Sequence, residues 1–264
     1  MTDATPIDKP RSRKTGKRVS GVDRVLQILD FLSDRGEAAT AYEIAKAVGA
    51  PISTVYVLTD DLIERKMLSR TGDKRVWLGP RVFRYGLAFE AGTDVLTEAK
   101  AEMNRLCEEL GETVQVCIRD EGQMVVAAMA EGEGHFRVTS HVGTRVPINW
   151  TASGRLLVGH LPPERRVELF TQHSRPSPTG SAETDPTILS DRARQDFEDR
   201  CAIQLGDSDF SVACIASPVV NGDGSCSATI SIVLPETKAR EKLDQLTDAV
   251  RRSARQIEQA IGAG

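Results

Sequence analysis

The sequence has few of the features that mark exported, disulfide-linked or membrane proteins. Its cysteines are odd in number and form no Cys-x-x-Cys pair: Cys107, Cys117, Cys201, Cys214 and Cys226. No apolar leader precedes the first polar residues, and no apolar run approaches the ~20 residues that a membrane span needs. We therefore expect a cytoplasmic protein with reduced thiols and no membrane partner.

Signatures of catalysis and metal binding are also lacking. We find no Gly-x-Ser-x-Gly, His-Glu-x-x-His, P-loop or Gly-x-Gly-x-x-Gly motif. The histidines are scattered: His135, His141, His160 and His173. His135 and His141 share one face of an expected strand, but two ligands are a weak metal signal. We expect neither an enzyme nor a bound cofactor or metal.

Residues 40–65 carry the pattern of two short helices joined by a tight turn. Thr40, with Glu43 three residues later, fits a capping box and predicts a helix that begins near Tyr42. Gly49 is placed to end this helix, and Pro51 suits the first turn of a second one.

The second of these helices is predicted to be amphipathic. Its apolar residues recur at a spacing of three and four, which commits one face to a core: Val55, Leu58 and Leu62. We expect another set to point to solvent: Ser53, Thr54, Tyr56, Val57 and Thr59. Two short helices with a glycine-containing turn are typical of a helix-turn-helix.

The flanking residues extend this motif to a winged helix-turn-helix. Upstream, a possible cap at Ser20 and apolar spacing predict a first helix that buries Val22, Val25, Leu26, Leu29 and Leu32. Downstream, residues 67–70 and 75–78 are β-like runs joined by turn residues 71–74, which predicts a small basic hairpin. We predict double-stranded DNA as a partner, contacted by Ser53, Thr54, Tyr56, Val57, Lys74 and Arg75.

The distribution of charge supports this assignment. The chain of 264 residues has a net charge of −4, but residues 1–91 hold 16 Lys and Arg against 12 Asp and Glu. The remaining residues hold 18 against 26, so a basic first part (net +4) precedes an acidic second part (net −8). We expect residues 1–19 to be a disordered basic tail that follows DNA phosphates, and 20–79 to be the DNA-binding domain.

Residues 80–93 are expected to form a linker helix, and residues 94–264 a second domain of the α+β class. Helical spacing predicts a helix over 95–110 and another over 237–261. Between them, alternating runs predict strands over 113–119, 124–130 and 136–141. Residues 212–220 and 226–234 flank Asn-Gly-Asp-Gly, the clearest hairpin signal of the chain.

Residues 143–162 are the segment most suited to hold a ligand. An extended run to Trp150 precedes a helix that is expected to begin near Thr151. Ala152, Ser153 and Gly154 expose backbone N–H groups at the positive end of this helix, which favours a carboxylate.

Four stretches of the chain stand out as motifs: VWLGPRVFRYG, GETVQVCI, GTRVPINWTASGRLLVGHLP and CIASPVVNGDGSCSATISI. Through them the chain, after its basic tail, resembles the IclR family of bacterial transcriptional regulators. This resemblance implies a winged-helix domain, a helical linker and a GAF-like effector-binding domain. It also implies a dimer or a dimer of dimers on a pseudo-palindromic operator. The resemblance places Ala152, Ser153, Gly154, Cys214 and Ser231 at the effector, with Asp207 and Asp209 as competing candidates for one acidic role.

The chain departs from the family pattern at several of these positions. Asn149 stands where a histidine is usual, Arg155 where a lysine is usual, and Val233 in place of a second serine. Because Val233 replaces a serine, we expect a less polar pocket. We expect the effector to be a small organic acid, such as a hydroxy, amino or aromatic acid from a catabolic pathway. The alternatives are an enzyme on the same fold and a redox sensor built on Cys214. A sensor needs an exposed thiol of low pKa, whereas Cys214 lies in an apolar strand.

Overall fold

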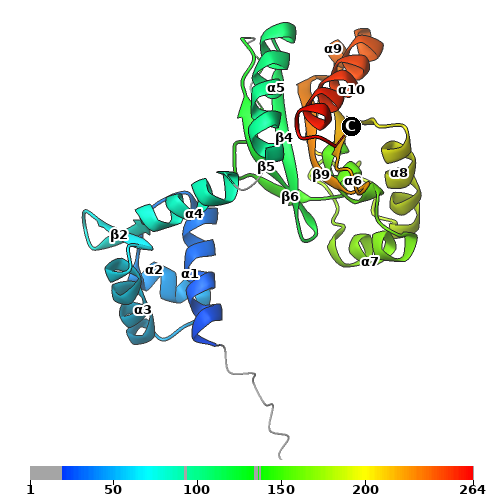
Figure 1. The fold of residues 1–264 in the computed structure, drawn as a ribbon. Coiled ribbons are helices and arrows are strands. Elements are labelled where there is room, and N and C mark those ends of the chain that lie inside the picture. The colour runs from blue at the N-terminus through cyan, green and yellow to red at the C-terminus, as the bar shows by residue number, and fades with distance from the viewer. Residues whose placement is uncertain (1–19, 92–93, 134–135, 137, 264) are drawn as a thin grey trace, which may run out of the picture. The chain divides into compact units, whose positions relative to one another are not determined.

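The computed structural model describes residues 20–91, 94–133, 136 and 138–263. The chain divides into two compact units, Met1–Phe89 and Glu90–Gly264, which we call the N-terminal and C-terminal units (Figure 1). The basic tail predicted for residues 1–19 and the linker residues 92–93 lie outside the described residues. No helix in the described part of the chain is long and apolar enough to cross a membrane.

The N-terminal unit is a winged helix-turn-helix, as predicted. Its helices are α1 (Gly21–Arg35), α2 (Ala41–Val48) and α3 (Ile52–Glu64), followed by α4 (Pro80–Ala91). The wing strands are β2 (Leu68–Thr71) and β3 (Arg75–Leu78). A strand that the sequence did not predict, β1 (Ala39–Thr40), pairs with β3 and completes a sheet of order β1-β3-β2.

Local hydrogen bonds fix the ends of these helices. The hydroxyl of Thr40 accepts the N–H of Glu43 (3.3 Å), and the Glu43 carboxylate accepts the N–H of Thr40 (2.8 Å). This confirms the capping box, and Ser20 forms a second one with Asp23. The hydrogen bonds from Thr40, and then that from Arg35 (2.9 Å), lower the pKa of Glu43 to about 2. Gly49 ends α2 in the left-handed conformation, with φ at 61°.

Two details of the helical faces were predicted wrongly. Thr59 is buried rather than exposed, and its hydroxyl donates to the carbonyl of Tyr56 (3.0 Å). Val22 and Leu26 remain 70% and 52% exposed, because Ile28 and Leu32 form the inward face of α1.

The C-terminal unit contains a six-stranded antiparallel sheet of order β6-β5-β4-β9-β8-β7. Its strands are β4 (Thr113–Asp120), β5 (Gln123–Ala130), β6 (Arg145–Pro147), β7 (Ala202–Leu205), β8 (Val212–Val220) and β9 (Cys226–Pro235). Its helices are α5 (Asp94–Leu110), α6 (Ala152–Gly159), α7 (Pro163–His173), α8 (Pro186–Glu198), α9 (Glu236–Glu241) and α10 (Leu243–Ala260). The predicted α+β class is therefore confirmed.

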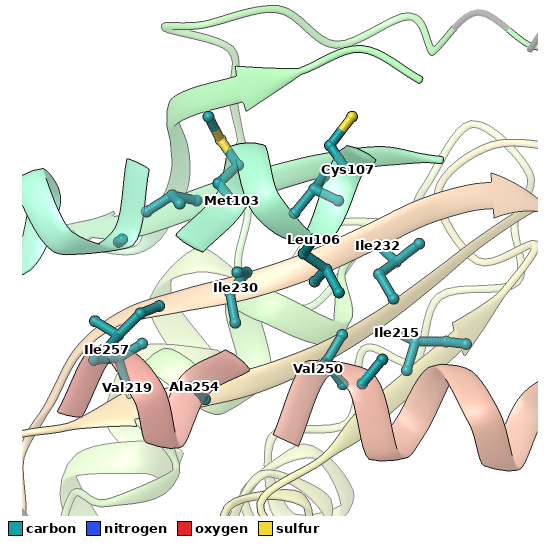
Figure 2. Close-up of a cluster of buried hydrophobic side chains, with 14 of the residues drawn as sticks. Met103, Leu106, Cys107, Ile215, Val219, Ile230, Ile232, Val250, Ala254 and Ile257 are labelled. Carbon is teal, nitrogen blue, oxygen red and sulfur yellow. The ribbon is translucent and has the colours of Figure 1, made fainter. Parts of the chain in front are cut away.

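Helices cover this sheet on both faces (Figure 1). On one face α5 and α10 bury an apolar core, shown in Figure 2, in which Leu106 of α5 and Val250 of α10 meet Ile215, Ile230 and Ile232 of the strands. On the other face α6 lies against β8 and β9, with α7 and α8 beyond it. We call these the core face and the cavity face.

Two predictions failed in this unit. The described residues of the stretch 136–141 form no strand, because β6 already occupies the free edge of β5. The predicted helix over 237–261 is divided into α9 and α10 at Lys242, whose φ of −123° is not helical. The element order of residues 163–205 had not been predicted from sequence.

Candidate ligand cavity and nucleic-acid interface

A cavity of about 380 Å³ opens between the cavity face of the sheet and the start of α6. It lies in the size range of small-molecule sites. Its wall is largely apolar, with Cys117, Met124, Val126, Trp150, Cys214 and Val233 among its residues.

The strand register arranges the floor of this cavity in rows. One row runs from Gln115 on β4 to Ser231 on β9 and Ala216 on β8. The next row runs through Val233 on β9 and Cys214 on β8 to Gln204 on β7. Residues two apart on a strand share a face, so both rows face the cavity side.

The N-terminus of α6 forms part of the wall. Thr151 caps the helix: its hydroxyl accepts the N–H of Gly154 (2.9 Å), and its carbonyl accepts that of Arg155 (3.3 Å). The N–H groups of Ala152 and Ser153 have no acceptor within the helix at its positive end, and that of Ser153 points to the Cys214 thiol. The Ser153 hydroxyl is buried and has no oxygen or nitrogen partner among the described residues.

Two departures from the family pattern have structural roles here. Arg155 is only 2% exposed, and it joins α6 to the carboxylate of Asp196 (2.7 Å) and to the carbonyl of Ile203 (2.9 Å). The buried amide of Asn149 donates to the carbonyls of Arg175 (2.9 Å) and Glu183 (2.8 Å). Both side chains hold the cavity wall in place by contacts to the chain that follows α6.

The thiols at the cavity are not poised to react. Burial raises the pKa of Cys214 to about 11, although Ser231 and Arg155 oppose the shift. Burial also raises the pKa of Cys117 to about 12, and the neighbouring Cys214 adds to the effect. A thiol-based sensor needs the opposite shift.

The predicted effector residues fall into two groups. Ser153, Asp209 and Cys214 line the cavity. The others do not line it: Ala152, Gly154, Ser231 and Asp207.

Three residues of the second group have other roles or positions. Ser231 lies on the cavity face between the thiols of Cys117 and Cys214, which cover it, and its hydroxyl donates to the carbonyl oxygen of Gln115 (3.5 Å). A Cβ on Gly154 would lie 2.2 Å from the carbonyl oxygen of Ile148, so this glycine allows α6 to approach the preceding chain. Asp207 lies in a separate depression with Arg155 and Arg192, and burial raises its pKa.

Sequence reasoning missed two buried amides at the cavity, Gln115 and Gln204. They are 4% and 2% exposed, and both belong to its lining. Gln115 donates from its side-chain nitrogen to the hydroxyl of Ser140 (2.8 Å). A polar residue among the apolar neighbours of β4 and β7 was the available signal.

The N-terminal half of α3 presents the predicted DNA-contacting side chains. Ser53, Thr54, Tyr56 and Val57 are all exposed, and Lys74 is exposed at the tip of the wing. Such an array of small polar, aromatic and apolar groups on one helix is suited to read base edges in a major groove.

Arg75 differs from this set. Its guanidinium donates to the carbonyl of Ala38 (2.9 Å) and lies 3.8 Å from the carboxylate of Glu43, so it braces the wing against the helices. Arg70 is instead an exposed cation of the wing that was missed, and it pairs with Asp60 of α3 (2.6 Å). This pair offsets one of the acidic charges of the helix.

The sequence suggests His135 and His141 as a weak pair of metal ligands. The ring nitrogen Nδ1 of His141 lies 3.2 Å from the hydroxyl of Thr144, and His135 lies outside the described residues. Within the described ranges no three His, Cys, Asp or Glu side chains gather as a metal site.

Two family models match the chain. Residues 89–259 match the family described as Bacterial transcriptional regulator IclR C-terminal, and residues 21–72 match the IclR helix-turn-helix domain. Among characterised relatives, the HTH-type transcriptional repressor AllR of Escherichia coli K12 is 28% identical over 249 residues, which cover 93% of this chain and 92% of that protein.

Solved structures share the fold. The crystal structure of an IclR homolog complexed with 4-hydroxybenzoate from Microbacterium hydrocarbonoxydans has a TM-score of 0.82 and 23% identity, and covers 93% of this chain and 100% of that chain. The Thermotoga maritima IclR has a TM-score of 0.70 and 23% identity, and covers 91% of this chain and 98% of that chain.

Proposed function

Because the chain belongs to the IclR family of bacterial transcriptional regulators, and is a DNA-binding regulator rather than an enzyme, we propose that it controls a catabolic operon in response to a small organic acid. The acid binds one per C-terminal unit and favours one of two arrangements of the DNA-binding units. A chromosomal operator places this function in the cytoplasm.

The observation that carries the effector proposal is the start of α6 at the cavity wall. A carboxylate seated there accepts the N–H and the hydroxyl of Ser153, which lines the cavity and whose hydroxyl has no oxygen or nitrogen partner among the described residues. These are charge-assisted bonds at the positive end of a helix, the arrangement that binds anions without a nearby cation. The apolar wall, with Val126, Trp150 and Val233, suits the body of the acid. The homolog complexed with 4-hydroxybenzoate supports an acid of this size.

The DNA proposal rests on α3 and the wing. We assign base contacts to Ser53, Thr54, Tyr56 and Val57, and a phosphate contact to Lys74. Because phosphate contacts release counterions, binding should weaken steeply as salt is raised.

We propose a homodimer, or a pair of dimers, on a pseudo-palindromic operator. The exposed apolar side chains of α1 and α4 support pairing of two N-terminal units: Val22, Leu26, Phe83 and Leu87. Two paired recognition helices read half-sites one or more helical turns apart. The name of the AllR relatives favours repression over activation.

The effector site is tested by Ser153→Glu, which puts a negative charge where the carboxylate is proposed to bind. In calorimetry, we expect the wild-type protein to bind small monocarboxylates and the variant to lose this binding. Ser153→Ala removes only the hydroxyl and should weaken binding about tenfold. Ser181→Glu adds the same charge at an exposed serine and is the matched control.

Operator binding without ligand checks that each variant is folded. An acid that binds Ser153→Glu as well as the wild-type protein would show that the carboxylate lies elsewhere. A screen in which only neutral or cationic compounds bind would remove the organic acid as effector.

A further inference from the structure

The stretch that joins α7 to α8 is held at both ends by one side chain. We call residues 175–183 the strap. The amide nitrogen of Asn149 donates to the carbonyls of Arg175 (2.9 Å) and Glu183 (2.8 Å), and the amide oxygen accepts the N–H of Arg175 (3.2 Å). Because Asn149 is buried and both ends of the strap meet at it, the strap has the form of an Ω-loop with a fixed base.

The middle of the strap is held together by its own hydrogen bonds. Ser177 accepts the N–H of Gly180 at its carbonyl (2.9 Å) and the N–H of Ala182 at its hydroxyl (3.2 Å). Ser177 and Ala182 are the buried residues of the strap, and its other residues are exposed or half-buried. Because little apolar surface is buried here, the strap can open locally at a lower cost in free energy than the sheet.

A hydrogen bond ties the middle of the strap to the opposite rim of the cavity. The hydroxyl of Thr179 donates to the carbonyl of Asp207 (2.6 Å), in the loop after β7. In the described part of the chain, this is the one hydrogen bond between residues 176–182 and another segment. Pro178 of the strap and Ser208 of the loop, which flank this bond, both line the cavity. Since Pro178 is also exposed to solvent, it lies at the mouth of the cavity.

We propose that the strap is the gate through which the effector acid enters and leaves the cavity, with Asn149 as its hinge and the bond from Thr179 to Asp207 as its latch. This inference rests on the proposed function, because it requires an acid that binds in this cavity. When the latch breaks, the internal hydrogen bonds let the strap turn about its base as one body. Pro178 then leaves the mouth, and ligand exchanges through the open state.

A gate has a kinetic signature that a ligand contact lacks. Thr179→Val removes the latch, and the loss of one hydrogen bond should raise the population of the open state about fivefold. The closed site is the same with and without the latch. The association and dissociation rate constants of an acid should therefore both rise about fivefold, while Kd stays unchanged. A residue that only shapes the site would instead raise the dissociation rate constant and Kd together.

The rate constants are measured on the full chain by stopped-flow fluorescence, with benzoate, 4-hydroxybenzoate and butyrate as probes. Trp150 lines the cavity and donates its indole N–H to the carbonyl of Arg175 (2.8 Å), so its fluorescence reports binding. Thr179→Ser keeps a hydroxyl for the latch and should restore the wild-type rate constants. Thr184→Val, at an exposed threonine just beyond the strap, is the matched control. Unchanged rate constants in Thr179→Val, or a rise in dissociation alone, would overturn the inference.

Hydrogen exchange without ligand tests the movement itself. Thr179→Val should speed exchange in peptides from residues 175–183 about fivefold and leave α7 and α8 unchanged. An equal increase in the two helices would show that the whole region unfolds, and the strap would not be a gate.

The outcomes also distinguish the two proposals. Acids that bind with rate constants insensitive to Thr179→Val leave the proposed function intact and remove the gate. Failure of every monocarboxylate in the calorimetric screen to bind the wild-type protein removes both.

Discussion

The two faces of the six-stranded sheet are built from the same strands but have opposite characters. On the core face, buried apolar residues of α5 and α10 fill the space against the strands, with Ile230 and Ile232 of β9 fully buried among them (Figure 2). On the cavity face, the alternate residues of β9 and β8 are Ser231, Val233 and Cys214, and a cavity remains. The period of two along each strand thus separates stability from ligand binding.

This difference shows how a pocket is kept open in a well-packed protein. Close packing on the core face fixes the strands, so the cavity face does not need to be filled. The wall of the cavity is held instead by directional bonds, such as those of Arg155 and Asn149. The predictions below test whether the two faces are as independent as this arrangement suggests.

The largest difference in stability between the two faces is expected when a large side chain is truncated on each of them. Ile230→Ala should cost about 2–5 kcal/mol in free energy of unfolding, because it leaves a void in a closed core. Met124→Ala should cost less, since its side chain already borders a cavity. Urea unfolding of both variants measures their free energies of unfolding. Equal losses of stability would show that the cavity face is packed as tightly as the core face.

Larger side chains at two neighbouring positions of β8 test the same difference between the core face and the cavity face. Ala213 is buried on the core face, and Cys214 lies on the cavity face. Ala213→Leu should destabilise the protein by about 1–3 kcal/mol through overpacking. Cys214→Leu should change stability by less than about 1 kcal/mol, because space is present, but should weaken acid binding.

Thermal unfolding measures the stability of each variant, and calorimetry on the same samples measures its binding of acids. A Cys214→Leu variant that binds acids normally would place the effector away from this part of the floor. A variant destabilised as strongly as Ala213→Leu would instead indicate that the cavity closes in solution.

The elements of the N-terminal unit could be predicted because their signals are local. Thr40 with Glu43 and Gly49 specify both ends of α2 within ten residues, and the turn 71–74 specifies the wing. The failures there concern long-range choices, such as the burial of Thr59. In the C-terminal unit, hairpins were predicted well, but the stretch 136–141 was not, because its pairing depends on which strand occupies the edge of β5.

The candidate site was predictable only in part for the same reason. Ser153 and Cys214 were found through a helix-start pattern and a family resemblance, and Asp209 as one of two candidates. Gln115 and Gln204 lie 89 positions apart in the sequence, and only the strand order places both of them on the floor of one cavity. A glutamine among apolar neighbours is the one local signal, and it does not tell which face of the strand lines a cavity.

The smallest predicted effect concerns the thiols of the cavity face. The pKa of Cys214 in the folded protein, about 11, lies above its ordinary value of 9.0. Folding therefore disfavours the thiolate, and the stability that the neutral thiol contributes is complete below pH 9 and is lost as the pH rises towards 11.

The stability advantage of the wild-type protein over Cys214→Ala should consequently shrink by about 1 kcal/mol between pH 7 and pH 10. Urea unfolding of the two proteins at both pH values measures this change, and the subtraction removes the titration of all other groups. The same experiment with Cys117→Ala should give a similar change, because burial also raises the pKa of Cys117. An advantage that stayed constant, or grew with pH, would mean that the thiolate is favoured in the folded protein. Cys214 would then satisfy the chemical requirement for a redox sensor, and the cavity face would have a second way to respond besides ligand binding.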